Sequence, residues 1–229
     1  MRSAILQQFE NAVIQSAGKP ENQHLNFIIV GGGPTGVELA GALAEIKKNV
    51  LPADYRELDP AKMEVHLVEG SGRVLPTMSE KSSRLAKKYL EQLGVKVWLN
   101  TLVNDYTGHE LLLKDGSSIA AENVIWTAGV KGATINGINP DAITKGNRIL
   151  VDGFNQIIGE ENIYAIGDIA LMQADGAYPN GHPGVAQVAM QQADNLVSNF
   201  KRIHNNKTQQ SFIYRNKGNM ATVGRHRAV

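Results

Sequence analysis

A glycine-rich turn between an apolar run and a helical pattern constrains the fold of this chain most strongly. Residues 26–30 form a short apolar run with the length of a buried strand, and the sequence GGGPTG at residues 31–36 follows it directly. Residues 37–45 then place apolar side chains at helical spacing. A dinucleotide-binding fingerprint requires this order of strand, turn and helix, so the pattern predicts a Rossmann-like unit rather than an ordinary loop.

The three spaced glycines of this turn have different tasks. Gly31 permits the tight turn, Gly33 lets the backbone approach a pyrophosphate, and Gly36 lets the helix lie close to the strand. Pro34 and Thr35 occupy the start of the helix, where the first N–H groups are unpaired and the macrodipole is positive. We therefore expect these five residues to bind the pyrophosphate of a dinucleotide.

Composition excludes several classes of function. The 229 residues are 42% apolar and 20% charged, which is typical of a soluble globular protein with one or two domains. The net charge of +1 favours neither nucleic acid nor an anionic membrane as a partner, and no apolar run is long enough to span a bilayer. Cysteine is absent and the six histidines lack ligand-like spacing, so we assign no disulfide, redox pair or metal site.

Apolar patterning divides the chain into three parts, at residues 1–23, 24–135 and 136–229. The first part contains an amphipathic helix over residues 3–17, which ends at the Gly-Lys-Pro sequence of residues 18–20. We interpret this helix as a connection that arrives from an upstream segment, because it precedes the first strand of the Rossmann-like unit.

The second part alternates strands and helices in the order β-α-β-α-β, which is the arrangement of a mononucleotide-binding half. Short strands and a Lys-Asp-Gly-Ser turn predict a β-meander inserted in it. The fold class is therefore α/β: a Rossmann-like domain with a β-meander insertion, followed by an incomplete second portion. The expected strands are 26–30, 63–69, 95–99, 102–106, 110–113, 118–120, 123–128 and 162–166, and the expected helices are 35–50, 79–94 and 182–204.

A carboxylate ends the second predicted strand of the Rossmann-like unit. Glu69 stands where dinucleotide-binding folds face the adenosine ribose, so it can accept hydrogen bonds from both ribose hydroxyls and repel a 2′-phosphate. It follows the glycines by more than the usual ~20 residues, because residues 52–62 intervene. The position favours NADH over NADPH, with Arg73 as a candidate phosphate contact.

Three residues of this unit have two interpretations each. Glu38 lies one turn into the first helix of the unit. It is either a carboxylate that interacts with the helix dipole or a functional residue beside the phosphate-binding turn, and the sequence alone does not separate the two. Ala128 and Gly129 end a strand in small residues, where parallel sheets bind ligands, although a plain turn glycine is the better local explanation.

Two motifs in the third part carry further candidates. A predicted buried strand ends in Gly167 and Asp168, which places a carboxylate within reach of a sugar or ribityl hydroxyl; an Asx-turn is the weaker alternative. Ala186 lies in the first turn of a helix that starts with small residues. Gln187 and Gln191 share one face of it, as surface glutamines of an amphipathic helix also would.

Together these motifs resemble the type II NADH:quinone oxidoreductases, FAD-dependent single-subunit enzymes of the superfamily that includes glutathione reductase. The resemblance implies NADH in residues 24–135, FAD against residues 147–200, and hydride transfer from nicotinamide C4 to flavin N5 before a quinone accepts the electrons. The matching segments are residues 31–41, 68–69, 126–130, 162–168, 186–192 and 214–225.

The resemblance also implies roles for individual residues. Glu38 would lie beside the nicotinamide and the flavin, and Asp168 would hold the ribityl–phosphate region of FAD. The helix that begins near Ala186 would face the pyrimidine edge of the flavin. Gln187 and Gln191 would border the quinone site, so these two residues and Glu38 are the catalytic candidates.

Two departures from the family pattern predict a fragment. The family's first glycine fingerprint, which binds the FAD pyrophosphate, and its membrane-docking helices are not found in the sequence. We expect the parent to be a respiratory-chain NADH dehydrogenase, peripheral to the cytoplasmic side of the membrane, and the fragment to be soluble, to bind NADH and to be inactive. Exposed sheet edges after residue 147 predict pairing with another copy as a homodimer. The alternatives are another FAD- and NAD(P)H-dependent reductase of the superfamily, and a non-catalytic dinucleotide-binding redox sensor.

Overall fold

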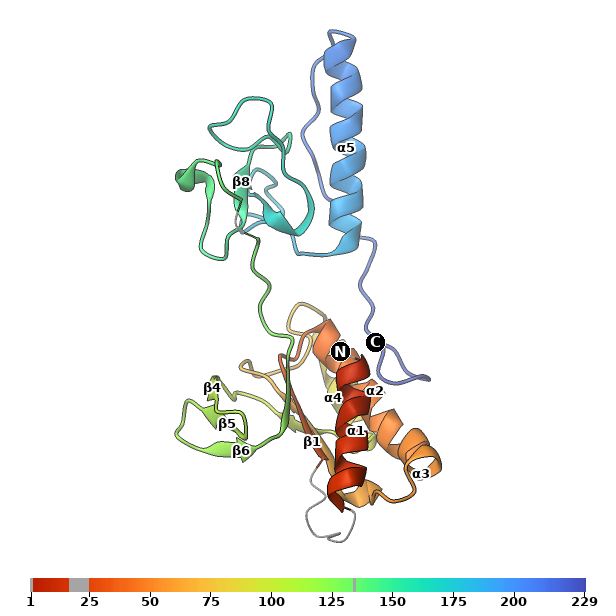
Figure 1. Cartoon of the computed structure of the whole chain (residues 1–229). Coiled ribbons are helices and arrows are strands. Elements are labelled where there is room, and N and C mark those ends of the chain that lie inside the picture. Colours follow the sequence, from red (N-terminus) through yellow and green to blue (C-terminus); the bar gives the residue numbers. More distant parts are fainter. Residues whose placement is uncertain (1, 17–24, 134) are drawn as a thin grey trace. The chain divides into compact units, whose positions relative to one another are not determined.

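The structure is a computed structural model that describes residues 2–16, 25–133 and 135–229. The chain forms two units (Figure 1): unit 1 comprises residues 1–129 and 219–229, and unit 2 comprises residues 130–218. Residues 219–229 therefore belong with the first unit, whereas the sequence analysis grouped them with the second. The helix end expected at residues 18–20 lies outside the described residues.

A parallel sheet of four strands forms the centre of unit 1, in the order β3-β2-β1-β7. Its register places Ile29 of β1 opposite Leu67 of β2 and Ile125 of β7. β1 and β2 are buried on both faces, which is why they are nearly continuous apolar runs. The strands are β1 (Leu25–Val30), β2 (Met63–Val68), β3 (Lys96–Trp98) and β7 (Asn123–Trp126).

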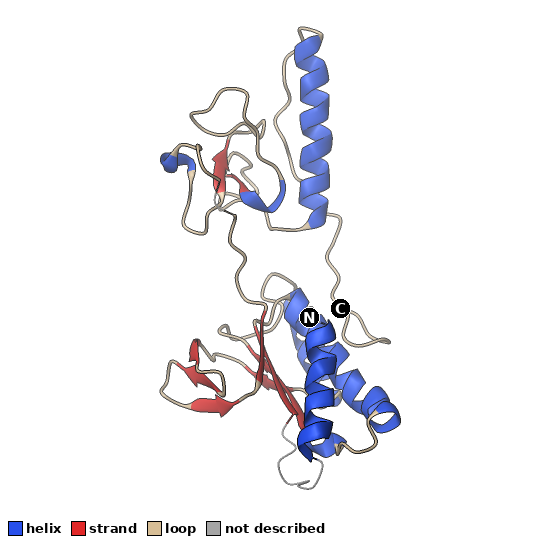
Figure 2. Cartoon of the chain, viewed as in Figure 1, coloured by secondary structure: helices blue, strands red, loops and turns tan. Residues whose placement is uncertain are grey.

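Helices cover one face of this sheet (Figures 1 and 2). Fully buried side chains of three of them, Phe9, Leu43 and Leu90, pack in one core with Phe27 and Leu67 of the sheet. Ser79 is the N-cap of the helix at Glu80–Gln92, as its sequence position suggests: its hydroxyl accepts a hydrogen bond from the N–H of Ser82. The helices are α1 (Arg2–Ser16), α2 (Pro34–Glu45), α3 (Leu51–Asp54) and α4 (Glu80–Gln92).

The helix predicted over residues 35–50 is not continuous. It ends as α2 and passes into a π-helical turn (Ile46–Val50) before α3 begins. Proline lacks an N–H and is tolerated in a first helical turn, which is where Pro52 lies in α3. These extra turns account for the long sequence separation between the glycines and Glu69.

The other face of the sheet carries the predicted β-meander (Figure 2). Its three antiparallel strands, in the order β4-β5-β6, bury Leu111 and Leu113 against Ile28, Val30 and Val68. The Rossmann-like α/β architecture with a β-meander insertion is therefore confirmed. The strands are β4 (Val103–Tyr106), β5 (Glu110–Leu113) and β6 (Ser118–Ala120).

Unit 2 has little regular structure apart from one long helix. Two short parallel strands, β8 (Ile149–Val151) and β9 (Ala170–Met172), precede α5 (Ala186–His204). The strand predicted over residues 162–166 is wrong: Tyr164 forms only an isolated bridge, and Asn162 has φ +63°, which is outside the β region. The helix predicted from residue 182 begins four residues later, because the residue before a proline is disfavoured in helical conformation.

Candidate functional site

The turn between β1 and α2 requires two of its glycines for its own geometry. Gly31 has φ +112°, which strains any residue with a side chain, and a Cβ there would lie 2.7 Å from the amide nitrogen of Ala128. A Cβ on Gly36 would overlap the carbonyl oxygen of Gly31. The close approach of α2 to the sheet therefore excludes a side chain at both positions.

Gly33 differs from these two glycines, because a Cβ there would meet nothing within 4 Å. Its φ of −70° and ψ of −179° are open to any residue. The fold itself does not need glycine here, so the space above the backbone is open to a bound group. Gly33 is also the N-cap of α2, and no side chain of the described residues caps this helix. The first-turn N–H groups of Thr35 and Gly36 are consequently available to an anion.

Glu69 lies beside this turn at the carboxyl end of β2. Its Oε2 accepts a hydrogen bond of 2.5 Å from the N–H of Gly32, and its Oε1 accepts one of 2.7 Å from the N–H of Ser71. Each carboxylate oxygen has two lone pairs, so both retain capacity for a ribose hydroxyl. Arg73, the candidate phosphate contact, instead donates to the carbonyl oxygen of Pro76 at 2.7 Å.

Thr127 holds the turn against the end of β7. Its hydroxyl lies 2.9 Å from the carbonyl oxygen of Val30 and 3.1 Å from that of Gly31, and it can donate to either. The sequence analysis named its neighbours Ala128 and Gly129 as candidate site residues and gave Thr127 no role. A hydroxyl residue at the end of a strand that adjoins the turn was the available signal.

Glu38 is exposed in the second turn of α2. Its Oε1 accepts a hydrogen bond of 3.1 Å from the N–H of Thr222. The structure therefore places Glu38 in unit 1 with the glycines and with residues 219–229, and it gives the carboxylate a partner that is distant in sequence.

Unit 2 brings Asp168 and the start of α5 together. Gly167 has φ +73° and donates its N–H to Oε1 of Gln192 at 2.7 Å. A Cβ on Gly184 would lie 3.3 Å from Oδ1 of Asp168, and α5 begins two residues later at Ala186 without a side-chain cap among the described residues. Gln192 is 1% exposed, and the sequence analysis did not identify it as a site residue, although its motif contains two adjacent glutamines.

Arg148 interacts electrostatically with this carboxylate. One of its terminal nitrogens donates to the carbonyl oxygens of Ala170 at 2.5 Å and His182 at 3.2 Å. Burial lowers the pKa of Arg148, and the charge of Asp168 acts in the opposite direction. The pair provides the candidate site of unit 2 with one cation and one anion.

Gln187 and Gln191 lie on one face of α5, as their spacing predicts, and both bind backbone. Gln187 donates to the carbonyl oxygen of Gly218 and accepts from the N–H of Lys217, each at 3.0 Å. Gln191 donates to the carbonyl oxygen of Arg215 at 3.0 Å and accepts from its N–H at 3.1 Å. The two side-chain amides thereby hold residues 215–218 along α5.

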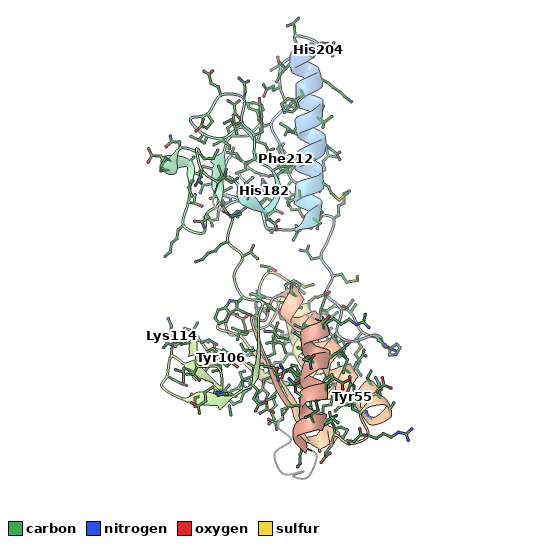
Figure 3. The ribbon with its side chains drawn as sticks, in the orientation of Figure 1. Tyr55, Tyr106, Lys114, His182, His204 and Phe212 are labelled. Carbon is green, nitrogen blue, oxygen red and sulfur yellow. The ribbon has the colours of Figure 1, made fainter. Side chains whose placement is uncertain are left out.

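A buried hydrogen bond between His182 and Asp175 supports the same region. Nε2 of His182 lies 3.0 Å from Oδ2 of Asp175, and the ring of Phe212 packs edge-on against His182 (Figure 3). Burial raises the pKa of Asp175, but hydrogen bonds from His182 and from the N–H groups of Ala177 and Tyr214 outweigh it, and the net shift is downward.

The described parts of the chain contain no group of three His, Asp or Glu side chains that could hold a metal ion. A search of the same residues found no helix long and apolar enough to cross a membrane.

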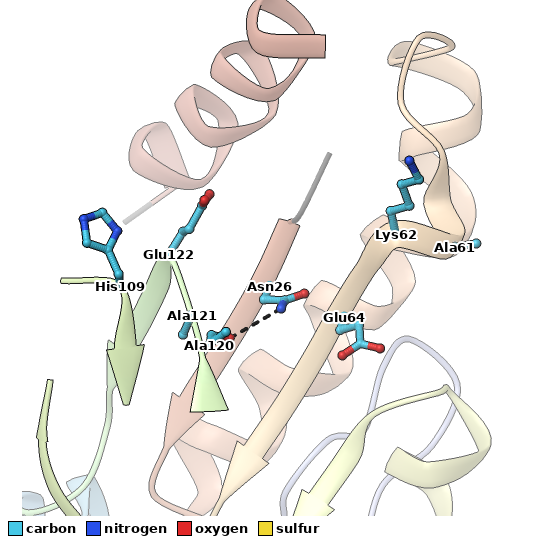
Figure 4. A pocket seen from close by; sticks show the side chains of 8 residues that line it. All are labelled: Asn26, Ala61, Lys62, Glu64, His109, Ala120, Ala121 and Glu122. Carbon is cyan, nitrogen blue, oxygen red and sulfur yellow. Dashed lines mark hydrogen bonds between the residues drawn. The ribbon is translucent and has the colours of Figure 1, made fainter. Parts of the chain in front are cut away.

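A cavity of about 580 Å³ lies at the amino-terminal ends of β1 and β2, at the opposite end of these strands from the glycine turn (Figure 4). Asn26, Glu64 and His109 are among its lining residues, and Nδ2 of Asn26 donates to the carbonyl oxygen of Ala120 at 3.4 Å. It contains none of the predicted site residues. Parallel sheets bind dinucleotides at the carboxyl-terminal ends of their strands, so this cavity is separate from the candidate site.

Comparison with known proteins identifies the family. A family model described as pyridine nucleotide-disulphide oxidoreductase matches residues 5–193. The chain belongs to this family. Type II NADH:quinone oxidoreductase NdhA of Mycobacterium tuberculosis is 32% identical over 242 residues, and the alignment covers 100% of this chain. The type II NADH:quinone oxidoreductase of Haemophilus influenzae is 32% identical over 232 residues, covering 96% of this chain.

These relatives are longer proteins. The chain spans about half their length, 50% of the first and 51% of the second. The solved structure of NDH2 from Plasmodium falciparum in complex with NADH superimposes with a TM-score of 0.83 at 21% identity, covering 96% of this chain and 61% of that one. This likeness confirms the fold, and the relatives confirm the resemblance to type II NADH:quinone oxidoreductases.

Proposed function

We propose that unit 1 binds NADH at the β1–α2 turn. The observation that carries this proposal is the open space at Gly33, in front of the start of α2, where no described side chain caps the helix. The N–H groups of Thr35 and Gly36 would bind the diphosphate there, where the helix dipole favours an anion. Gly31 and Gly36 would keep the turn tight beneath it.

Glu69 would select NADH over NADPH. Its carboxylate is already oriented by Gly32 and Ser71, and each oxygen can accept one more hydrogen bond from a ribose hydroxyl. A 2′-phosphate at the same place would bring two anions together without an added cation, since Arg73 donates to its own loop.

We further propose that the chain is part of a flavoprotein NADH:quinone oxidoreductase. The residues of unit 2 fit FAD. The Asp168 carboxylate could accept from a ribityl hydroxyl, and the start of α5 at Ala186, which no side chain of the described residues caps, could face a flavin carbonyl. Bound FAD would supply the redox chemistry by accepting hydride from NADH and passing electrons to a quinone. The similarity of the whole chain to type II NADH:quinone oxidoreductases supports this assignment.

The side chains of the protein would bind and orient the NADH, FAD and quinone, and would not react themselves. Glu38, Gln187 and Gln191 are our proposed residues of the nicotinamide and quinone sites, and Ala128 and Gly129 would leave room for the nicotinamide ring. We also propose that the whole protein is peripheral to the cytoplasmic side of the membrane and forms a homodimer. The sequence contains a single glycine fingerprint of the G-x-G-x-x-G form, which we assign to NADH. Because tight binding of FAD in the family uses a fingerprint of its own, we expect this chain to bind NADH and to be inactive alone.

Titration of the 229-residue chain with NADH and NADPH tests the proposal for unit 1. We expect saturable binding of NADH and weaker binding of NADPH, because of Glu69. The variant Glu69→Gln should narrow the difference by removing the negative charge. NADPH binding as tight as NADH binding would contradict the role of Glu69. NADH oxidation with a soluble quinone and added FAD tests the expected inactivity of the chain alone.

A further inference from the structure

Residues 219–229, which we call the clasp, fold back onto α2 of unit 1 (Figure 1). The clasp is a short hairpin: Ala221 and Val229 exchange two backbone hydrogen bonds of 3.1 and 3.0 Å, and the N–H of Val223 donates to the carbonyl oxygen of Arg227 at 2.8 Å. Ala221 and Val223 are fully buried in the core shared with the helices. The clasp is therefore an ordered part of unit 1.

One face of α2 is shaped to receive this hairpin. A Cβ on Gly41 would lie 2.7 Å from the amide nitrogen of Gly224, so the two backbones meet where only glycine fits. Glycine is unfavourable in the interior of a helix, and this close approach explains its presence. Gly41 is thus a contact residue for the clasp.

Two carboxylates on the same face of α2 anchor the clasp at both sides of Gly41. Oε1 of Glu45 accepts a hydrogen bond of 2.7 Å from the N–H of Arg225, and Oε1 of Glu38 accepts one of 3.1 Å from the N–H of Thr222. The spacing of three and four residues between Glu38, Gly41 and Glu45 places them along one stripe of the helix.

We infer that the clasp is a positioning element of the dinucleotide site, which acts through Glu38. Glu38 is exposed, and its long side chain would otherwise sample many rotamers at the start of α2. The N–H of Thr222 restricts it to one orientation, so the entropy of ordering it is lost on folding rather than on binding. This inference rests on the proposed binding of NADH beside Glu38.

Two variants loosen the clasp without altering the glycine turn. Gly41→Ala forces the hairpin away from α2. Glu45→Ala removes the acceptor of the Arg225 N–H without adding an atom between α2 and the clasp. We expect both to raise the hydrogen-exchange rate of the Thr222 amide and to weaken NADH binding by about 2- to 10-fold, the effect of one unordered long side chain. Lys88→Ala, on the exposed surface of α4, is the matched control and should change neither.

Substitutions at Glu38 establish that the clasp acts through this residue. Glu38→Ala should weaken NADH binding at least as much as Glu45→Ala does, and the double variant should be no weaker than Glu38→Ala. Glu38→Gln retains an acceptor oxygen, so the Thr222 amide should stay protected.

The outcomes separate the inference from the proposed function. Faster exchange at Thr222 with unchanged NADH affinity in Gly41→Ala and Glu45→Ala would overturn the positioning role alone. If the unaltered chain does not bind NADH, the proposed function itself fails. If Gly41→Ala does not fold, Glu45→Ala still carries the test, because it introduces no steric overlap between α2 and the clasp.

Discussion

Replacing Gly33 by serine should separate the stability of unit 1 from its ability to bind NADH. The backbone of Gly33, at φ −70° and ψ −179°, already has the extended conformation of a serine N-cap, and a Cβ would meet nothing within 4 Å. The new hydroxyl can accept from the N–H of Thr35 or Gly36. Serine exceeds glycine as an N-cap by a few tenths of a kcal/mol, roughly, so the free energy of unfolding should stay unchanged or rise slightly.

NADH binding should respond in the opposite direction. The serine side chain would occupy the open space and take an N–H group from the diphosphate. A hydrogen bond to a charged group contributes about 1.5–3 kcal/mol, so the loss of one should weaken binding by about 10- to 100-fold. Thermal unfolding followed by circular dichroism measures the first quantity, and titration followed by NADH fluorescence measures the second.

Gly36→Ser provides the contrast. Its Cβ would overlap the carbonyl oxygen of Gly31, so this variant should lose both stability and binding. The reasoning is refuted if Gly33→Ser binds NADH as tightly as the unaltered chain, or if it is destabilised as much as Gly36→Ser.

Three further predictions concern single side chains. Gln192→Ala leaves the N–H of Gly167 without its acceptor, and chemical denaturation should show a loss of about 1–3 kcal/mol in the stability of unit 2. The lowered pKa of Asp175 means that its contribution to stability is present above the ordinary value of 3.8 and is lost as pH falls through the lowered pKa. Urea unfolding at about pH 5 and about pH 3 should show a loss of stability, and Asp175→Asn should make that loss smaller. Burial lowers the pKa of His66, with Glu64 partly opposing, so unit 1 should lose stability as pH falls below 6.5, and His66→Phe should remove that dependence.

The dinucleotide-binding turn could be predicted because its requirements are local. The tight turn at Gly31 and the close packing at Gly36 follow from backbone geometry, and the sequence already contains the strand and helix on either side. Glu69 could be located for the same reason, since the end of a parallel strand lies at the binding edge of the sheet. The π-helical turn before α3 was not predicted, because its apolar spacing matches that of an ordinary helix.

The partners of several site residues could not be predicted, because they lie far away in the sequence. Thr222 is separated from Glu38 by 184 residues, and no periodicity connects them. The role of Gln192 depends on the unusual conformation of Gly167, which only the folded chain shows. The strand expected before Gly167 failed for a local reason: Asn162 adopts a left-handed conformation that its apolar neighbours do not reveal.

A titration of ¹⁵N-labelled chain with NADH, followed by amide chemical shifts, tests the central claim most directly. If the backbone at the start of α2 binds the diphosphate, the largest shifts should occur at the amides of Thr35 and Gly36 and at Ser71 beside Glu69. Shifts confined to the cavity at the amino-terminal ends of β1 and β2, around Asn26 and His109, would contradict it.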